Sequence, residues 1–105
     1  MRFKKGKFLI MYNDHLEGRE AWLSEDGHFG FCKLGCMWEV VHVGTGIYLW
    51  AAKTRKDCAQ WLEEKGFAYV EKATKLGYVD KAREQFTAML TKDDEARHFM
   101  GIKEE

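Results

Sequence analysis

Several features that would point to a particular class of protein are missing from this sequence of 105 residues. Proline is absent, and 17 basic side chains balance 17 acidic ones. Proteins that bind chiefly through phosphate contacts usually carry a basic excess, so this balance lowers the expectation of a nucleic-acid partner. No apolar run approaches the ~18 residues of a membrane span, and the apolar run at residues 8–12 is too short for a secretory signal. We therefore expect a cytoplasmic protein with no membrane partner.

Catalytic signatures are missing as well. The sequence has no phosphate-binding loop, no GxSxG or HExxH motif and no dinucleotide-binding fingerprint. Its three cysteines are an odd number, which fits a reducing compartment better than a disulfide framework. We therefore expect no enzymatic activity and no cofactor.

Short stretches rich in β-branched and aromatic residues dominate the first half of the chain and predict strands. They lie near residues 8–12, 19–24, 28–32, 36–43 and 47–53. Three of the connections are three-residue loops that end in glycine, at Glu25–Gly27, Lys33–Gly35 and Gly44–Gly46. Such loops are typical of antiparallel hairpins whose last loop residue needs a positive φ. The pattern predicts an antiparallel meander of four to five strands, over about residues 7–53.

Helical spacing dominates the second half of the chain. Thr54 followed by Asp57 is a capping signal that begins a helix, and Gly66 is expected to end it. Apolar residues then recur at helical spacing to Gly77 and again over residues 79–90, whereas residues 67–71 would also suit a strand. A last short helix, capped by Thr91, would run to Gly101.

Together these patterns predict a single α+β domain over residues 1–105. Two to three helices, over about residues 54–100, are expected to pack on one face of the sheet, and residues 101–105 are expected to form a mobile end. With 46% hydrophobic residues, the chain is long enough to bury a core of its own.

Residues that flank a three-residue loop lie opposite each other, so the predicted loops set the register of the sheet. The predicted pairs are Ser24–His28, Cys32–Cys36 and Val43–Ile47. Alternation then predicts one largely apolar face, expected to form the core and to carry the helices. Its members are Ala21, Leu23, Phe29, Phe31, Met37, Val41, Val43, Ile47, Leu49 and Ala51, with Glu39 as the one charged member.

The second face gathers aromatic residues among small and titratable ones, and it is the best candidate for a binding site. The candidate partner-binding residues are Trp22, Trp38, His42, Tyr48 and Trp50. Aromatic platforms bind the bases of single strands, and tryptophan and tyrosine are also favoured in protein-binding hot spots. A third interpretation is a second small core, covered by the first strand, by residues 67–77 or by the partner in a homodimer.

Charge for a nucleic acid would have to come from the margins of this aromatic face, because the face itself holds no lysine or arginine. The candidate phosphate-contacting residues are Arg2, Lys4, Lys5, Lys7, Arg55 and Lys56. We therefore favour a protein partner over a nucleic acid.

Four residues of metal-binding type, His28, Cys32, Cys36 and His42, occur within fifteen positions. In the predicted register His28 and Cys32 are about 13 Å apart along one strand, whereas a tetrahedral zinc needs its donors within ~2.0–2.3 Å of one point. A four-ligand site and the sheet exclude each other. Cys32 and Cys36 remain a candidate pair for a metal or a disulfide, with two buried small side chains as the favoured interpretation.

Two further residues of reactive type are expected to be structural. Cys58 lies beside Ala59, Trp61 and Leu62 in the first predicted helix, and this apolar setting favours a core position over a nucleophile. Glu39 would have a raised pKa if buried, as general acids do, but no second carboxylate accompanies it.

Residues 38–62 form two predicted strands, a turn and a helix, with the turn reading Lys53-Thr54-Arg55-Lys56-Asp57-Cys58-Ala59. This stretch resembles the amino-terminal arm-DNA-binding module of phage-type tyrosine integrases, in which a three-stranded sheet leads through a Lys-Thr-x-Lys-x-x-Ala-like turn into one helix. The resemblance covers about a quarter of the chain and implies a sheet that docks into a DNA groove. Family members carry basic residues on that face, where this chain has tryptophan, cysteine and histidine.

The interpretation favoured by the sequence is a small non-catalytic binding protein that acts through its aromatic face on a macromolecular partner. It is similar in type to small phage or mobile-element accessory proteins, such as anti-CRISPR-like inhibitors of host defence. One alternative is a module that binds DNA or single-stranded nucleic acid. A second is a small metal or thiol protein that uses Cys32 and Cys36.

Overall fold

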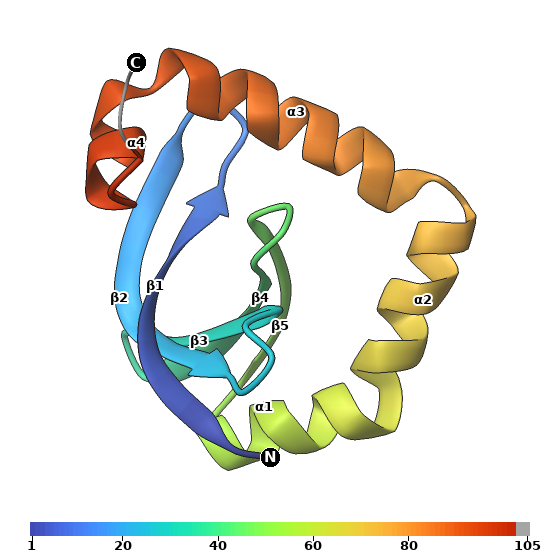
Figure 1. Cartoon of the computed structure of the whole chain (residues 1–105). Coiled ribbons are helices and arrows are strands. Elements are labelled where there is room, and N and C mark those ends of the chain that lie inside the picture. Colours follow the sequence, from blue (N-terminus) through green and yellow to red (C-terminus); the bar gives the residue numbers. More distant parts are fainter. Residues whose placement is uncertain (103–105) are drawn as a thin grey trace.

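The computed structural model describes residues 1–102, in which five strands precede a series of helices (Figure 1). The strands form one antiparallel sheet in the order β1-β2-β3-β4-β5. Their bounds are β1 Phe3–Met11, β2 Leu16–Ser24, β3 Phe29–Leu34, β4 Met37–His42 and β5 Ile47–Ala52. The predicted α+β class and meander are confirmed. The predicted mobile end falls largely on residues 103–105, which lie outside the described residues.

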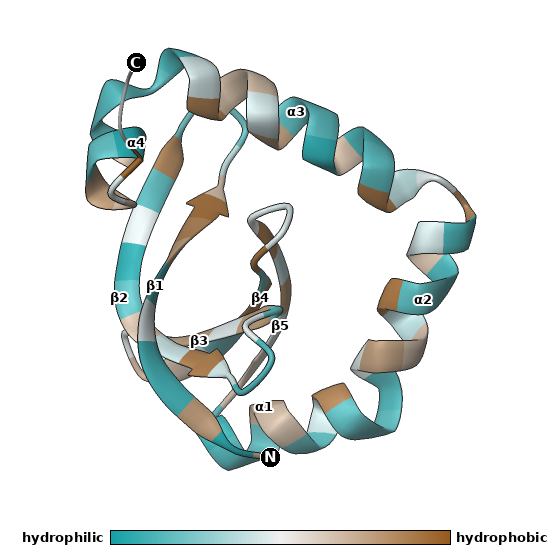
Figure 2. Ribbon diagram, viewed as in Figure 1, coloured by the Kyte–Doolittle hydropathy of each residue, from teal (hydrophilic) through white to brown (hydrophobic). Residues whose placement is uncertain are grey.

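The helices form an arc around the sheet, with α1 at the bottom of the view, α2 at the right and α3 and α4 at the top (Figure 1). Their bounds are α1 Arg55–Trp61, the π-helical turn η1 Leu62–Gly66, α2 Phe67–Lys75, α3 Tyr78–Lys92 and α4 Asp94–Phe99. Figure 2 shows mostly hydrophilic residues along the outer side of this arc. No helix among residues 1–102 combines the length and apolar character needed to cross a membrane.

The prediction that Gly66 ends the first helix is wrong. Its φ of −66° is helical, and α1, η1 and α2 follow one another without a break up to Gly77, where φ is +81°, although the backbone bends between α1 and α2 (Figure 1). A Cβ at position 66 would lie 2.6 Å from Leu62 Cδ1 and 2.8 Å from Trp61 Cζ3. Glycine is therefore required here by the packing of two side chains from the preceding turn, and residues 67–71 are helical rather than a strand.

Side-chain caps begin two of the helices. The Thr54 side chain accepts a hydrogen bond of 3.0 Å from the backbone N–H of Asp57, as predicted for the start of α1. At α4 the cap is Asp93, which accepts from the N–H of Ala96 at 2.9 Å. The prediction that Thr91 caps this helix is wrong, because Thr91 lies within α3 and its hydroxyl donates to a carbonyl one turn earlier.

The three predicted turn glycines all adopt positive φ: +78° at Gly27, +61° at Gly35 and +69° at Gly46. The loops that contain them hold four, two and four residues, however, rather than three each. The predicted pairs across the first two loops are therefore wrong, and Trp22 pairs with Phe31. A glycine with positive φ serves turns of several lengths, so its presence does not determine the register.

A β-bulge shifts the register between β4 and β5. The observed pairs are Val40–Trp50, Val41–Tyr48 and His42–Ile47. The Val40–Trp50 pair agrees with the predicted register. Beyond the bulge, each residue of β4 pairs with the residue of β5 one position earlier than predicted, so the predicted Val43–Ile47 pair is wrong. Leu49 is left without an opposite residue, which is typical of a bulge and reverses the alternation of side chains along β5.

The sheet has an outer face, which the helices cover, and an inner face, which the curled β1–β2 ribbon encloses. The buried members of the inner core are Phe8, Ile10, Cys32 and Val41. Phe8 of β1 lies directly against the backbone of β3, because a Cβ at Gly30 would be 2.8 Å from three carbons of its ring. A hydrogen bond of 2.7 Å from the Met11 N–H to the carbonyl of Gly46 closes the end of the ribbon.

Two separate clusters fill the space between the outer face and the helices. In the first, Phe29, Phe31 and Val40 of the sheet pack against Cys58 of α1 and Leu62 of η1. In the second, Leu9 and Leu16 of the β1–β2 ribbon pack with Ala96 of α4. Phe99 packs on the ribbon so closely that a Cβ at Gly18 would be 2.5 Å from its ring. The helices are thus anchored at both ends of the arc.

Candidate functional site

The tryptophans of the predicted aromatic face belong largely to the core beneath α1. Trp22 and Trp38 are half-buried and pack against the cluster of Phe31, Val40 and Leu62. Phe29 and Phe31 face the helices, as predicted, but they do so together with the tryptophans rather than on the opposite side of the sheet. An open five-residue platform is therefore not what the structure presents. Of the interpretations open to the sequence, a second core comes closest for these two side chains.

Tyr48 lies apart from the other four predicted site residues. The bulge at Leu49 pairs Tyr48 with Val41, whose side chain belongs to the inner core, whereas Trp50 pairs with Val40 on the outer face. Tyr48 is 48% exposed and Trp50 is 45% exposed. The two residues thus present aromatic surface on opposite faces of the same strand.

Trp50 is held in place by a neighbour from α1. Its ring stacks on that of Trp61, with centroids 5.1 Å apart and planes at 1° to each other. Gly66 makes this arrangement possible, because a larger residue there would collide with the Trp61 indole. The exposed face of Trp50 consequently offers an apolar surface beside the edge of the sheet.

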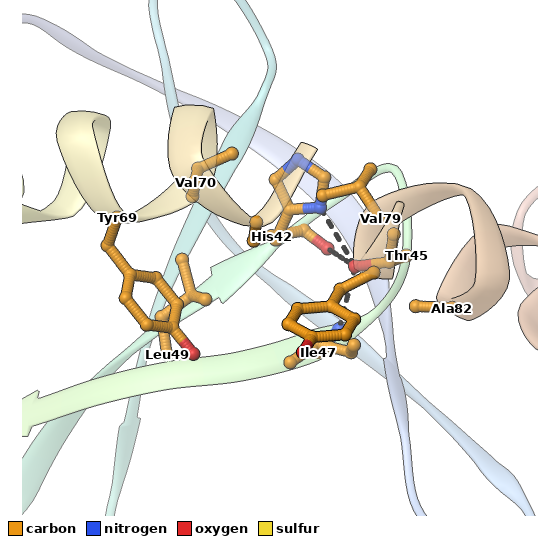
Figure 3. Close-up of a pocket in the computed structure, with 10 residues that line it drawn as sticks. His42, Thr45, Ile47, Leu49, Tyr69, Val70, Val79 and Ala82 are labelled. Carbon is orange, nitrogen blue, oxygen red and sulfur yellow. Dashed lines mark hydrogen bonds between the residues drawn. The ribbon is translucent and has the colours of Figure 1, made fainter. Parts of the chain in front are cut away.

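Beyond Trp50, β5 and the helices α2 and α3 enclose an apolar cavity of about 100 Å³ (Figure 3). The residues that line it are His42, Thr45, Ile47, Leu49, Tyr69, Val70, Ala73, Tyr78, Val79 and Ala82. Tyr69 and Tyr78 stand at its rim, 60% and 63% exposed. We name the outer edge of β5, Trp50 and this lined cavity the β5–α2 surface.

The cavity exists because α2 stands away from the sheet. No residue of α2 is fully buried, and it contacts the core beneath α1 through Val70 and through Phe67, whose ring centroid lies 5.5 Å from that of Phe29. Gly77 then turns the chain, so that Val79 and Ala82 of α3 close the far side of the cavity (Figure 3). Figure 3 also shows the Tyr69 ring lying over Leu49.

Two polar residues lie among these apolar ones. Thr45 is only 1% exposed, and its hydroxyl lies 2.8 Å from Nδ1 of His42 and 3.5 Å from the carbonyl oxygen of His42. The hydroxyl donates to that carbonyl oxygen, and the tautomer of the imidazole sets which partner donates in the shorter contact. Burial lowers the pKa of His42, and the charges of Arg83 and His28 lower it further. The imidazole is therefore neutral near pH 7 and offers one N–H donor.

The structure separates the six candidate phosphate-contacting residues. Lys4 lies opposite Leu23, on the inner-face side of β1. Arg2 borders a depression that includes the acidic residues Glu25, Asp26 and Glu63. Lys56 is exposed on α1. These three residues do not join the tryptophans.

Lys5 and Arg55, by contrast, meet at Trp22. The Lys5 ammonium lies 4.7 Å from the Trp22 ring centroid, and the Arg55 guanidinium lies 4.6 Å from it. The guanidinium also lies 4.5 Å from the Phe3 ring and 5.8 Å from the Trp38 ring. Cations at such distances are attracted to the negative faces of the rings.

Two more lysines adjoin this group. Lys7 follows Lys5 on the same side of β1, and its ammonium lies 5.4 Å from the Phe99 ring. Lys33 pairs across the strands with Trp38 and is exposed. We name Lys5, Lys7, Lys33 and Arg55, with Trp22 and Trp38, the basic–aromatic patch.

Cys32 and Cys36 do not form the predicted pair. Cys32 pairs with Glu39 and is buried, whereas Cys36 lies exposed in the turn after Leu34. Burial, and after it the charge of Glu39, raise the pKa of Cys32 to about 11. Within residues 1–102 no three histidine, cysteine or acidic side chains gather in a way that would hold a metal ion.

The positions of Cys58 and Glu39 are explained by packing rather than by a reactive role. Cys58 is fully buried, as predicted, with a pKa raised by burial, and its thiol donates to the carbonyl of Trp38 at 3.4 Å. Glu39 lies on the inner face, where burial raises its pKa and Arg19 partly offsets that rise. Arg19 itself is bound to Glu17 at 2.7 Å. This cluster provides a carboxyl with a raised pKa and a fixed ion pair rather than a nucleophile.

Sequence patterns alone did not identify Tyr69, Tyr78 or the cavity. Tyr69 fits the apolar stripe of its helix, so the spacing predicts a buried position, yet it is largely exposed. Tyr78 follows Gly77 and lies outside the apolar stripe of residues 79–90. This position is the one sequence feature that indicates an exposed tyrosine.

The chain matches no protein-family model, and neither the curated proteins nor the solved structures searched contain a match. The resemblance of residues 38–62 to an integrase arm-binding module therefore stays a prediction.

Proposed function

We propose that this protein is a non-catalytic binding protein that holds an extended segment of a protein partner along the β5–α2 surface. The observation that carries the proposal is the combination of an open sheet edge with an apolar cavity rimmed by exposed tyrosines. This surface replaces the aromatic face that the sequence predicts as the binding site, and it retains Trp50 and His42 from that prediction.

The edge of β5 is suited to pairing with another strand. β5 is the last strand of the sheet, so among the described residues its outer edge has no neighbouring strand beyond the contact of Gly46 with Met11. Natural edge strands are commonly protected by charges or proline. Residues 47–52 contain neither, and the bulge at Leu49 is their one irregularity. An extended segment can add here through backbone hydrogen bonds.

The side chains beside this edge suit the recognition of a protein. Tyrosine and tryptophan are enriched in binding hot spots, and charged residues are depleted from interface cores. The cavity of about 100 Å³ is smaller than the ~150 Å³ cavity that admits benzene, which matches one aliphatic side chain rather than an indole. The His42 ring nitrogen that does not face Thr45 would form a hydrogen bond with the backbone of the partner at the rim.

A selection from displayed random peptides on the purified protein tests the proposal. Replacing Tyr69 or Tyr78 by alanine should weaken the selected peptides about thirtyfold, which corresponds to the ~2 kcal/mol of a hot-spot residue. Tyr48→Ala is the matched control, because Tyr48 is similarly exposed on the opposite face of the same strand. Peptides that tolerate the first two variants and are lost in the control would contradict the proposal.

The oligomeric state of the free protein tests a second occupant of the same edge. If light scattering shows a dimer that Tyr69→Ala or Tyr78→Ala dissociates, the segment held by β5 belongs to a second copy of the chain. A monomer leaves the edge available to another protein.

A further inference from the structure

The basic–aromatic patch is a second surface whose chemistry differs from that of the β5–α2 surface. Its central element is the Arg55 guanidinium, which lies within 6 Å of the ring centroids of Phe3, Trp22 and Trp38. Lys5 approaches Trp22 as well. None of these contacts belongs to the cavity beside β5.

Three cations of the patch, Lys5, Lys7 and Arg55, lie against aromatic rings rather than carboxylates. Among residues 1–102 no ion pair joins Lys5, Lys33 or Arg55 to an acidic side chain. A ring attracts a cation through its quadrupole and does not neutralise it, so the positive charge stays available to an anion. The opposing charge on this face is Glu20, which pairs across the strands with Lys7.

The spread of the cations matches a chain of anions better than a single one. Lys5 and Lys7 are about 6.6 Å apart along β1, and β1 and β3 are separated by about 10 Å. These backbone spacings spread the four cations over β1, β3 and α1, so successive phosphates of a strand can each contact one of them. The half-buried indoles of Trp22 and Trp38 add apolar surface for bases between the charges.

We propose that the basic–aromatic patch binds single-stranded nucleic acid, with Lys5, Lys7, Lys33 and Arg55 contacting phosphates beside the indoles of Trp22 and Trp38. The proposal is independent of the function proposed for the β5–α2 surface, because the two sites share no residue. Neither surface requires the other to be occupied.

Binding is measured by the fluorescence anisotropy of a labelled oligothymidylate of about a dozen nucleotides, with tryptophan emission recorded in parallel. Four phosphate contacts to a single strand correspond to a slope of about −2.8 in a plot of log K against log salt. Affinity should therefore fall roughly fiftyfold when the salt concentration is raised fourfold. Tryptophan emission should be quenched as the oligonucleotide binds.

Single substitutions assign the contacts. Lys5→Ala, Lys33→Ala and Arg55→Ala should each reduce the magnitude of the salt slope by about 0.7. Because Arg55 packs on three rings, its removal also affects folding, whereas Lys33 is exposed and its variant keeps the test independent of stability. Lys72→Ala on α2 is the matched control for the same loss of charge, and it should leave the slope unchanged.

The proposal would be overturned if the protein did not bind the oligonucleotide at low salt, or if Lys33→Ala and Lys72→Ala lowered the affinity equally. Equal competition by a polyglutamate of the same charge would overturn it as well. Tighter binding of a duplex than of the oligothymidylate would also contradict it. Tyr78→Ala should retain full oligonucleotide binding, so a failure here is distinguishable from a failure of the peptide-binding proposal.

Discussion

The contact between Phe8 and Gly30 offers a quantitative test of how the β1–β2 ribbon closes over the sheet. Replacing Gly30 by alanine adds one Cβ, which would lie 2.8 Å from three carbons of the Phe8 ring. Phe8 is fully buried, so its ring cannot turn away into solvent. The backbone at Gly30 is not in the left-handed region, so its conformation does not disfavour alanine. The contact with Phe8 is therefore the obstacle to an alanine at this position.

Two opposing effects determine the expected magnitude. Overpacking a core costs about 1–3 kcal/mol, whereas replacing glycine by alanine at a compatible position stabilises by about 0.4–1 kcal/mol through the unfolded chain. We expect Gly30→Ala to lower the free energy of unfolding by about 1–2 kcal/mol. Gly44→Ala is the matched control, because its Cβ would be 3.5 Å from its nearest neighbour, an ordinary contact. That variant should be neutral or slightly stabilising.

Urea denaturation followed by circular dichroism measures both variants, with an unchanged m-value as the sign that only stability has changed. In a Phe8→Leu background the added Cβ meets a smaller side chain, so the cost of Gly30→Ala should shrink by at least ~1 kcal/mol. The reasoning is refuted if Gly30→Ala is as harmless as Gly44→Ala. It is also refuted if the cost is the same in both backgrounds.

Three further predictions concern a cap, the thiols and a buried histidine. Thr54→Ala removes the acceptor at the start of α1 and should cost about 1 kcal/mol in urea denaturation, with Thr54→Ser restoring most of it. An aromatic disulfide reagent should react rapidly with Cys36 in the folded protein. It should react with Cys32 and Cys58 only after unfolding, because both thiols are buried and have raised pKa values. Rapid reaction of three thiols per chain would contradict this. Burial holds the pKa of His42 below its ordinary 6.5, so the unfolded chain binds this proton at a higher pH than the folded chain does. The free energy of unfolding should therefore fall as the pH drops through about 6.5, and His42→Gln should reduce this loss.

The sequence predicted the five strands and their order, because their β-branched and aromatic runs are local signals. The first two strands begin earlier than predicted, at Phe3 rather than near residue 8 and at Leu16 rather than near residue 19. It also identified the glycines that need positive φ, among them Gly27 and Gly35. The number of residues in each loop was not determined by these glycines, and one extra residue moves a whole strand to the other face. For this reason β3 was predicted the wrong way round, with Phe31 facing away from Trp22.

The candidate site shows the same division. Alternation correctly placed Trp22, Trp38 and Trp50 on one face of the sheet. It did not predict that the first helix would cover this face. That choice depends on Cys58 and Leu62, which are distant in sequence from most of the strands they contact. The predicted platform therefore became core, apart from Trp50 and the ring surfaces that Lys5 and Arg55 approach.

The sequence by itself determined the elements of this protein: the strand and helix segments, the cap at Thr54 and the turn glycines, each of which is set by neighbouring residues. Only the tertiary structure decided the loop lengths, the bulge at Leu49, the continuation of the helix through Gly66 and the cavity beneath Tyr69. These features depend on contacts between segments far apart in the chain, such as Gly30 with Phe8. A cavity between such segments cannot be predicted from a local sequence pattern.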